Sequence, residues 1–385
     1  MRFEFATAQR VLFGPGTLRE VAPLAAELGR RALVVVGRSS QNAARLIAAL
    51  NQHGLTAEAF HITGEPTLAA IQAGLQSARA LDCDVVIGLG GGSALDAGKA
   101  IAALLTNPGE ALDYLEVVGR GRTLEQAPAP YLAVPTTAGT GSEATRNAVL
   151  AVPEQRVKVS LRSPRMLPRA AIVDPELTLT APPFVTATAG LDALTQLIEP
   201  FVGNAANPLT DALCREGLRL MARSLRRVHE RPGDLAGRSD LALASLFGGM
   251  ALANARLGAV HGFAAPLGGM FPAPHGAICA RLLPLVMDAN IAALRTPRSS
   301  SRPSLGRFDE VAQLLTGNPN ASAADGVAWV RETGETLEVP PLSRYGVTEA
   351  DIPAVVAQAQ KANSMRGNPV TLLDDELAAV LRQAL

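Results

Sequence analysis

The sequence predicts two halves, an α/β half built on a parallel sheet and then a mostly helical half. In the first half, short runs of β-branched and other apolar residues alternate with segments of helical periodicity. In the second half the strand-like runs disappear. The chain has 385 residues, which is enough for two hydrophobic cores. We expect an α/β domain over residues 1–180 and a helical domain over residues 181–385.

Buried strands and intervening helices account for the first half. Short, continuous apolar runs are typical of strands covered on both faces of a parallel sheet. They occupy residues 32–36, 85–87, 131–134 and 171–173. Segments 41–53 and 67–80 have apolar residues at helical spacing, so the order predicts βαβ units. Asp174 and Pro175 end the pattern near residue 180.

The second half begins beyond Pro182 and Pro183, where Ala/Leu-rich segments 211–229 and 240–257 have helical periodicity. A cluster of Pro, Arg and Ser over residues 297–303 predicts a solvated, mobile loop. Residues 2–5 are expected to form a strand. That strand and the long helices offer surfaces for self-association, so we expect a homodimer or a larger homo-oligomer.

Composition excludes several classes of protein. Apolar residues make up 48% of the chain, which indicates a packed globule. Lys plus Arg and Asp plus Glu each total 35, so no basic excess favours nucleic acid. No signal peptide and no membrane-spanning segment is predicted, and a cytoplasmic protein is the expectation. The three cysteines, Cys83, Cys214 and Cys279, are widely spaced and are interpreted as buried or incidental thiols.

A glycine-rich turn follows the second predicted strand. Residues 85–93 read VVIGLGGGS, and residues 94–105 then have helical periodicity, with Ser93 placed to cap the helix. Glycines at such a turn let backbone N–H groups approach a phosphate, although tight strand-to-helix packing alone can also require them. A hydroxyl-rich loop over residues 135–143 follows the next strand on the same sheet edge. Two such loops favour a dinucleotide.

These two segments, GGGSALDAGK over residues 90–99 and PTTAGTGSE over residues 135–143, resemble signatures of the iron-containing alcohol dehydrogenase family, including its maleylacetate-reductase-like members. The resemblance implies a Rossmann-like sheet domain followed by a helical domain, as in dehydroquinate synthases, with NAD or NADP as cofactor. By resemblance, the pyrophosphate would be bound by Gly90, Gly91, Gly92, Ser93 and Asp96. The ribose and nicotinamide region would be lined by Thr136, Thr137, Thr140, Asn147 and Lys158. An exposed strand with solvated charges is the alternative for Lys158.

The residue after the first strand bears on the choice between NAD and NADP. An acidic residue there would bind a ribose 2′-hydroxyl and repel a 2′-phosphate, but the position is Gly37. Arg38 and Ser39 follow and could receive a phosphate. We therefore expect NADP to be accepted.

A metal site is predicted in the second half. Asp192 and Gln196 are four residues apart on one helix face, and His261 and His275 follow in apolar surroundings. The family resemblance places metal ligands at these four positions, with a histidine where this chain has Gln196. One carboxylate and two imidazoles suit Fe²⁺ or Zn²⁺, whereas an amide is a poorer ligand. A further histidine usual in the family is replaced by Ala265.

The predicted activity is an NAD(P)-dependent interconversion of a small alcohol and its aldehyde or ketone. The metal would polarise the substrate oxygen while hydride passes to or from the nicotinamide. The candidate catalytic residues are Asp192, His261, His275 and Lys158. Alternatives are a metal-independent, maleylacetate-reductase-like enzyme, a dehydroquinate-synthase-like lyase, and a nucleotide-binding protein that lost its metal. His53, His61 and His229 are interpreted as surface or packing residues.

Overall fold

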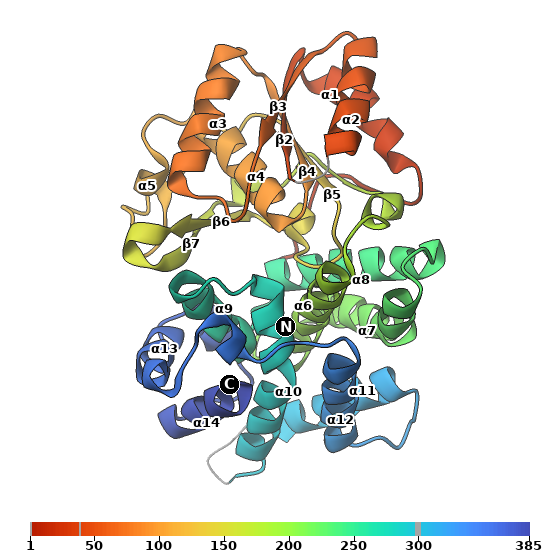
Figure 1. Cartoon of the computed structure of the whole chain (residues 1–385), viewed down its shortest axis with the longest axis vertical. Helices are drawn as coiled ribbons and strands as arrows, with labels where there is room; N and C mark the ends of the chain where they lie inside the picture. Colours follow the sequence, from red (N-terminus) through yellow and green to blue (C-terminus); the bar gives the residue numbers. More distant parts are fainter. Residues whose placement is uncertain (1, 38–39, 297–301) are drawn as a thin grey trace. The chain divides into compact units, whose positions relative to one another are not determined.

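A computed structural model describes residues 2–37, 40–296 and 302–385. The chain forms two compact units. One unit is Ala6–Ala181, and the other is Pro182–Leu385 together with the residues that precede Ala6. Figure 1 shows the sheet-containing unit in red to yellow-green and the helical unit in green to blue. Arg38, Ser39 and most of the expected loop at 297–303 lie outside the described residues.

A six-stranded parallel sheet forms the centre of the first unit, in the order β1-β8-β5-β4-β2-β3. Its strands are β1 (Val11–Phe13), β2 (Arg31–Val36), β3 (Thr56–His61), β4 (Val85–Gly90), β5 (Tyr131–Pro135) and β8 (Ala170–Val173). The four predicted strands are confirmed as β2, β4, β5 and β8. The sequence analysis missed β1 and β3, which are the two edge strands.

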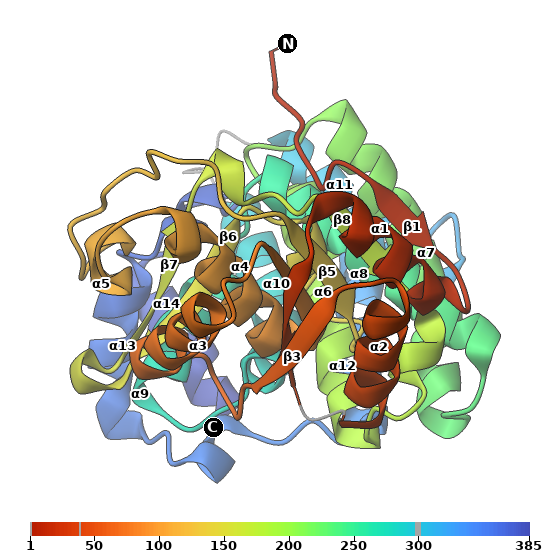
Figure 2. The same ribbon diagram turned by 90° about the horizontal axis from the view of Figure 1, so that it is seen from above.

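Helices cover both faces of this sheet. They are α1 (Val21–Leu28), α2 (Ser40–Gln52), α3 (Leu68–Ala80), α4 (Gly92–Thr106) and the short α5 (Ala111–Tyr114). Alternate residues of β2 belong to different cores: Val34 packs in the core with α1 and α2, and Val35 packs in the core with α3 and α4. The two helix pairs accordingly flank the sheet (Figures 1 and 2). An antiparallel hairpin, β6 (Asn147–Val152) and β7 (Val157–Arg162), completes the unit.

The second unit contains only helical elements among its described residues. The α-helices are α6 (Pro183–Val202), α7 (Pro208–Glu230), α8 (Leu235–Asn254), α9 (Ala259–Met270), α10 (His275–Leu294), α11 (Arg302–Thr316), α12 (Ala323–Thr336), α13 (Ile352–Ala359) and α14 (Asp374–Ala384). The two predicted helices correspond to α7 and α8. The expected strand at residues 2–5 is wrong: these residues form no strand, and the first strand is β1, at Val11–Phe13.

Helix α10 departs from one expectation of the sequence analysis. It is long and apolar enough to cross a bilayer, with a mean hydropathy of 1.6 in its most apolar window, and α8 and α9 pass the same test as a pair bent by 96°. However, 67% of the α10 window is buried inside the protein, as in a core helix, so this is weak evidence for a membrane span.

Candidate cofactor and metal sites

The glycine-rich turn joins β4 to α4. Strand β4 ends at Gly90, Gly91 is the N-terminal cap residue of α4, and the helix begins at Gly92. Ser93 therefore lies inside the first helical turn, and the expectation that it caps the helix is wrong: the cap makes no side-chain hydrogen bond. The exposed N–H groups of this helix start are the kind that bind phosphate.

Close packing explains why the turn needs glycine. A Cβ atom on Gly90 would lie 3.0 Å from the backbone nitrogen of Gly37 on the neighbouring strand end. A Cβ on Gly92 would lie 2.7 Å from Cγ2 of Thr140, and one on Gly91 would lie 3.3 Å from Oγ1 of Thr137. The structure thus brings the glycine turn and the hydroxyl-rich loop into contact, as the sequence predicts.

Asp96 and Lys99 on α4 hold the second loop in place. Asp96 accepts hydrogen bonds from Ser142 Oγ at 2.5 Å and from the backbone N–H of Val149 at 2.9 Å. Lys99 is buried, and its ammonium donates to Ser142 O at 2.9 Å, Thr145 Oγ1 at 2.8 Å and Asn147 O at 2.6 Å. The Asp96 carboxylate thus already has protein partners, and its contact with a cofactor stays a prediction.

Two other predicted cofactor residues lie in the hairpin. Lys158, in β7, forms a salt bridge with Glu65, with 2.9 Å between Nζ and Oε1. Its side chain is only 9% exposed, so the alternative interpretation of Lys158 as a solvated charge on an exposed strand is wrong. Asn147 begins β6 and is half-buried.

The sequence analysis assigned no role to the buried Glu143. Burial raises the pKa of its carboxyl group to about 7, an effect that the positive charge of Lys99 opposes.

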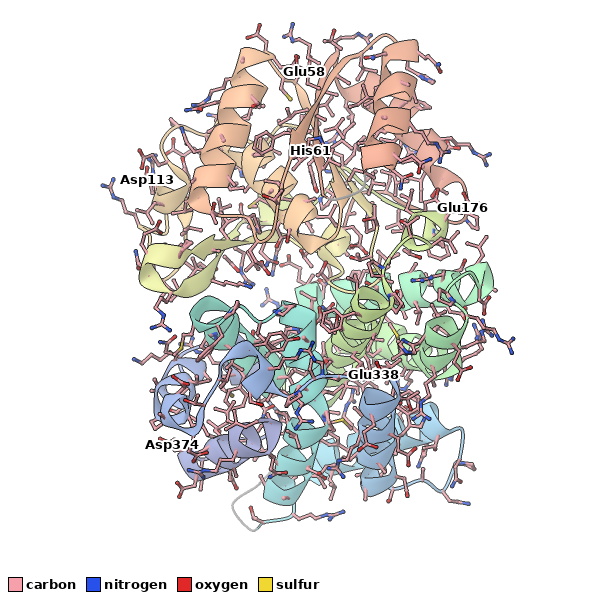
Figure 3. All side chains as sticks on the ribbon, viewed as in Figure 1. Glu58, His61, Asp113, Glu176, Glu338 and Asp374 are labelled. Atoms are coloured by element: carbon pink, nitrogen blue, oxygen red, sulfur yellow. The ribbon has the colours of Figure 1, made fainter. Side chains whose placement is uncertain are left out.

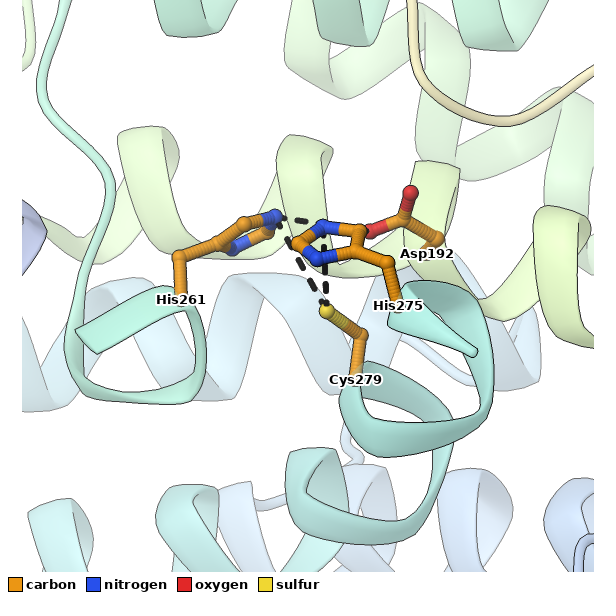
Figure 4. A group of neighbouring side chains, drawn as sticks. All are labelled: Asp192, His261, His275 and Cys279. Carbon is orange, nitrogen blue, oxygen red and sulfur yellow. Dashed lines mark hydrogen bonds and ion pairs between the residues drawn. The ribbon is translucent and has the colours of Figure 1, made fainter. Parts of the chain in front are cut away.

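A compact cluster of ligand-type side chains lies in the helical unit (Figure 4). It consists of Asp192 from α6, His261 from α9, and His275 and Cys279 from α10. One ligand atom from each lies within 4.8 Å of all the others. The structure therefore brings together the predicted ligands Asp192, His261 and His275 and adds a cysteine.

Helix spacing and close helix contacts assemble the cluster. His275 and Cys279 are four residues apart, which places them on one face of α10. A Cβ on Gly276 would lie 2.7 Å from the carbonyl oxygen of Thr188, so glycine allows α10 to approach α6 closely. All three cysteines are buried free thiols, as the sequence analysis allowed, and Cys279 in addition lies beside the two histidines. Its i, i+4 relation to His275 was the sequence signal that could have found it.

The ligand atoms have the spacing that a divalent ion requires. Asp192 Oδ1 lies 3.4 Å from His261 Nε2 and 3.6 Å from His275 Nε2. Cys279 Sγ lies 3.9 Å and 3.7 Å from the same two nitrogens. With bonds of about 2.1 Å to N and O and about 2.3 Å to S, tetrahedral angles give separations of about 3.4 Å for N and O and about 3.6 Å for N and S.

The charges around the cluster also favour a cation. Asp192 Oδ1 is buried and has no hydrogen-bond partner among the described residues. Burial lowers the pKa of His275, but the negative charges of Cys279 and Asp192 outweigh it and raise that pKa to about 9. The pKa of His261 is raised in the same way, by Cys279 and Glu199 against the effect of burial. A divalent metal ion therefore fits the donor set and its electrostatic surroundings.

Glu199 supports the cluster from behind. Its Oε2 lies 2.7 Å from His261 Nδ1, and its Oε1 accepts the backbone N–H of Val260 at 2.7 Å. A proton on Nδ1 leaves the Nε2 lone pair directed at the cluster, which is a common device at metal-bound histidines. The sequence analysis missed Glu199, although its position seven residues after Asp192 places both on one face of α6.

The departures from the family pattern lie close by. Gln196 is 2% exposed, and its Oε1 has no hydrogen-bond partner among the described residues. Gln196 packs closely against α8: a Cβ atom added to Gly248 of that helix would lie 3.2 Å from the Cβ of Gln196. Ala265 is half-buried, one turn after His261. Of the remaining histidines, His53 and His61 are exposed, the latter at the end of β3 (Figure 3), and His229 is half-buried.

Comparisons with known proteins identify the class. Residues 8–175 match the family described as iron-containing alcohol dehydrogenase, and residues 186–385 match the C-terminal domain of the same family. The 1,3-propanediol dehydrogenase of Klebsiella pneumoniae is 34% identical over 395 aligned residues, which cover 99% of this chain and 98% of the relative. The chain belongs to the iron-containing alcohol dehydrogenase family. It is an alcohol/aldehyde oxidoreductase, and the family implies NAD and a divalent metal, iron.

Solved structures agree with this assignment. The crystal structure of a 1,3-propanediol oxidoreductase superposes with a TM-score of 0.92 at 33% identity and covers 100% of both chains. A sulfoacetaldehyde reductase from Bifidobacterium kashiwanohense, solved in complex with NAD⁺, has a TM-score of 0.87 at 27% identity, covering 100% of this chain and 99% of the other.

Proposed function

We propose that this enzyme acts on small alcohols and on the corresponding aldehydes or ketones, with Asp192, His261 and His275 among the ligands of a catalytic metal. The observation that carries the proposal is the group of ligand atoms at metal-ligand spacing, which come from three buried residues and the half-buried His275. A metal bound there supplies a Lewis acid for the substrate oxygen. Glu199 keeps the proton on Nδ1 of His261, so that Nε2 is available as a ligand. The relatives that act on 1,3-propanediol support a short-chain substrate.

Metal analysis combined with a chelation assay tests this proposal. The protein is purified without added metal, bound metals are measured by elemental analysis, and oxidation of NADH is followed with a panel of carbonyl compounds. We expect near-stoichiometric iron or zinc, and turnover that chelators abolish and either metal restores. Asp192→Ala should lose both metal and activity. Full activity without metal would refute the metal-assisted mechanism and favour the maleylacetate-reductase-like alternative, which Gln196 and Ala265 favour.

We propose that the glycine turn binds the pyrophosphate of NAD and that NADP is also accepted. In support, Gly37 places no carboxylate after β2, where an acid would repel a 2′-phosphate. Thr137 and Thr140 lie against Gly91 and Gly92, and the family resemblance adds Lys158, in β7, to the cofactor residues. Comparing kcat/KM for NADH and NADPH tests the cofactor range, and a strong preference for NADH would exclude NADP.

We also propose a cytoplasmic homodimer or larger homo-oligomer. All three cysteines are free thiols, as is usual in a reducing compartment. Strand β1 is an edge strand on which Val11 and Phe13 are 39% and 36% exposed, and an edge of this kind can pair with another chain. Light scattering of the purified protein measures the assembly, and a monomer at micromolar concentration would contradict it.

A further inference from the structure

We propose that Cys279 binds the metal as a thiolate, which makes the protein ligands Asp192, His261, His275 and Cys279. The inference rests on the proposed metal site and deepens it, because it names a ligand that the resemblance to the family did not supply. It depends on the position of the sulfur atom, on the unpartnered oxygen of Asp192, and on the surroundings of Gln196.

The position of the sulfur fits a ligand better than it fits a hydrogen bond. Sγ of Cys279 lies 3.7 Å from His275 Nε2 and 3.9 Å from His261 Nε2, close to the separation of about 3.6 Å expected between S and N on one tetrahedral zinc ion. A thiol has one S–H and can donate to one imidazole nitrogen at a time. A cation between the atoms would satisfy both nitrogens and the sulfur together.

Asp192 supplies an independent observation. Its Oδ1 is buried, has no hydrogen-bond partner among the described residues, and is directed at the same two imidazole nitrogens as Cys279 Sγ (Figure 4). A buried oxygen without a hydrogen-bond partner destabilises the folded protein, and more so when it is charged. The arrangement is therefore explained by an ion that contacts Asp192, both histidines and Cys279.

Gln196 is the competing fourth ligand. Its amide oxygen is also buried and has no hydrogen-bond partner in the part of the chain that the structure describes, but its side chain packs against Gly248 of α8, a helix that contributes no atom to the cluster. Thiolate is a much better ligand than a neutral amide for zinc and for other late divalent metals. Four protein ligands leave room for chemistry because catalytic zinc can expand to five-coordinate geometry.

Cobalt substitution tests the assignment directly. The metal-free protein is loaded with Co²⁺, and its near-ultraviolet absorption is recorded, where a thiolate ligand gives an intense charge-transfer band. We expect this band in the wild type, its loss in Cys279→Ser, and its retention in Cys214→Ser, which alters another buried cysteine of the helical unit. Gln196→Ala should also keep the band. Circular dichroism checks that each variant is folded.

Each outcome decides the question. One equivalent of Co²⁺ without the band, or a band that persists in Cys279→Ser, would overturn the thiolate assignment while leaving the metal site intact. No uptake of Co²⁺ by the wild type would overturn both the ligand and the metal-assisted mechanism.

A second measurement needs no variant. X-ray absorption of the zinc-loaded wild type should require one sulfur scatterer at about 2.3 Å. A first shell of only nitrogen and oxygen would exclude Cys279, even if Cys279→Ser failed to fold.

Discussion

Replacing Glu199 with glutamine should weaken metal binding through the tautomer of His261. Glu199 accepts two hydrogen bonds, from His261 Nδ1 and from the backbone N–H of Val260, both at 2.7 Å. In Glu199→Gln the amide oxygen can still accept from Val260, but the NH₂ group then faces Nδ1. It donates there and leaves the proton on Nε2, where the metal requires a lone pair. The substitution keeps the size of the side chain, so little else changes.

The expected magnitude follows from these two bonds. A hydrogen bond to a charged group contributes about 1.5 to 3 kcal/mol, against about 0.5 to 1.5 kcal/mol for a neutral one. Replacing the charged acceptor by a neutral amide therefore lowers the stability of the His261 tautomer that can bind metal by about 1 to 2 kcal/mol, the difference between the two kinds of hydrogen bond. This corresponds to about a 5- to 30-fold loss of metal affinity, which overlaps the range of about 10- to 100-fold found when partners of metal-bound histidines are removed.

Competition against a chelator of known affinity measures the effect. Glu335→Gln, a change at an exposed glutamate on α12, is the matched control and should leave the affinity unchanged. Thermal unfolding of the metal-free proteins separates a general loss of stability from a loss of affinity. An unchanged dissociation constant in Glu199→Gln would refute the reasoning, because it would mean that Glu199 does not control His261.

Three further predictions concern the first unit. The pKa of Glu143 rises from 4.5 to about 7 on folding, so between these pH values the native state keeps a proton that the unfolded state has lost, and the free energy of unfolding falls as pH rises. This fall should amount to about 3 kcal/mol between about pH 4 and pH 8 in the wild type and should be absent in Glu143→Gln, as measured by urea unfolding at each pH. Gly92→Ala should raise KM for NAD, because the new Cβ would lie 2.7 Å from Thr140 Cγ2, and an unchanged KM would exclude this turn from the cofactor site. Lys158→Met should raise KM for NAD but cost less than about 1 kcal/mol of stability, because its salt bridge partner Glu65 is 45% exposed; the same KM change in Glu65→Gln would assign the effect to the salt bridge.

The strands that the sequence predicted are those that are buried on both faces of the sheet. Strands β2, β4, β5 and β8 are covered on both faces, so each is a continuous apolar run in the sequence. Strand β3 is an edge strand with exposed Thr56, Glu58 and Ala59, and it lacks such a run. Strand β1 has only three residues. Both depend on pairing with a neighbouring strand, which local sequence does not encode.

The candidate sites show a similar limit. Asp192, His261 and His275 could be found because the family resemblance marks their positions. Cys279 and Glu199 were missed because their meaning depends on which helices meet: α10 approaches α6 through Gly276, and α9 places His261 against Glu199. Spacing of four or seven residues marks a shared helix face but does not reveal what that face contacts.

The charge of the cluster gives a physical reason for a cysteine at this position. With Asp192 and Cys279 ionised and both imidazoles neutral, the four side chains carry two negative charges. A divalent ion balances these two charges. Asp192 is 1% exposed and Cys279 is 0% exposed, and uncompensated charge is costly at such depth. The thiolate thus supplies a strong donor in place of the histidine that Gln196 replaces, and its negative charge makes the metal a weaker Lewis acid than the same ion held by one carboxylate and neutral ligands.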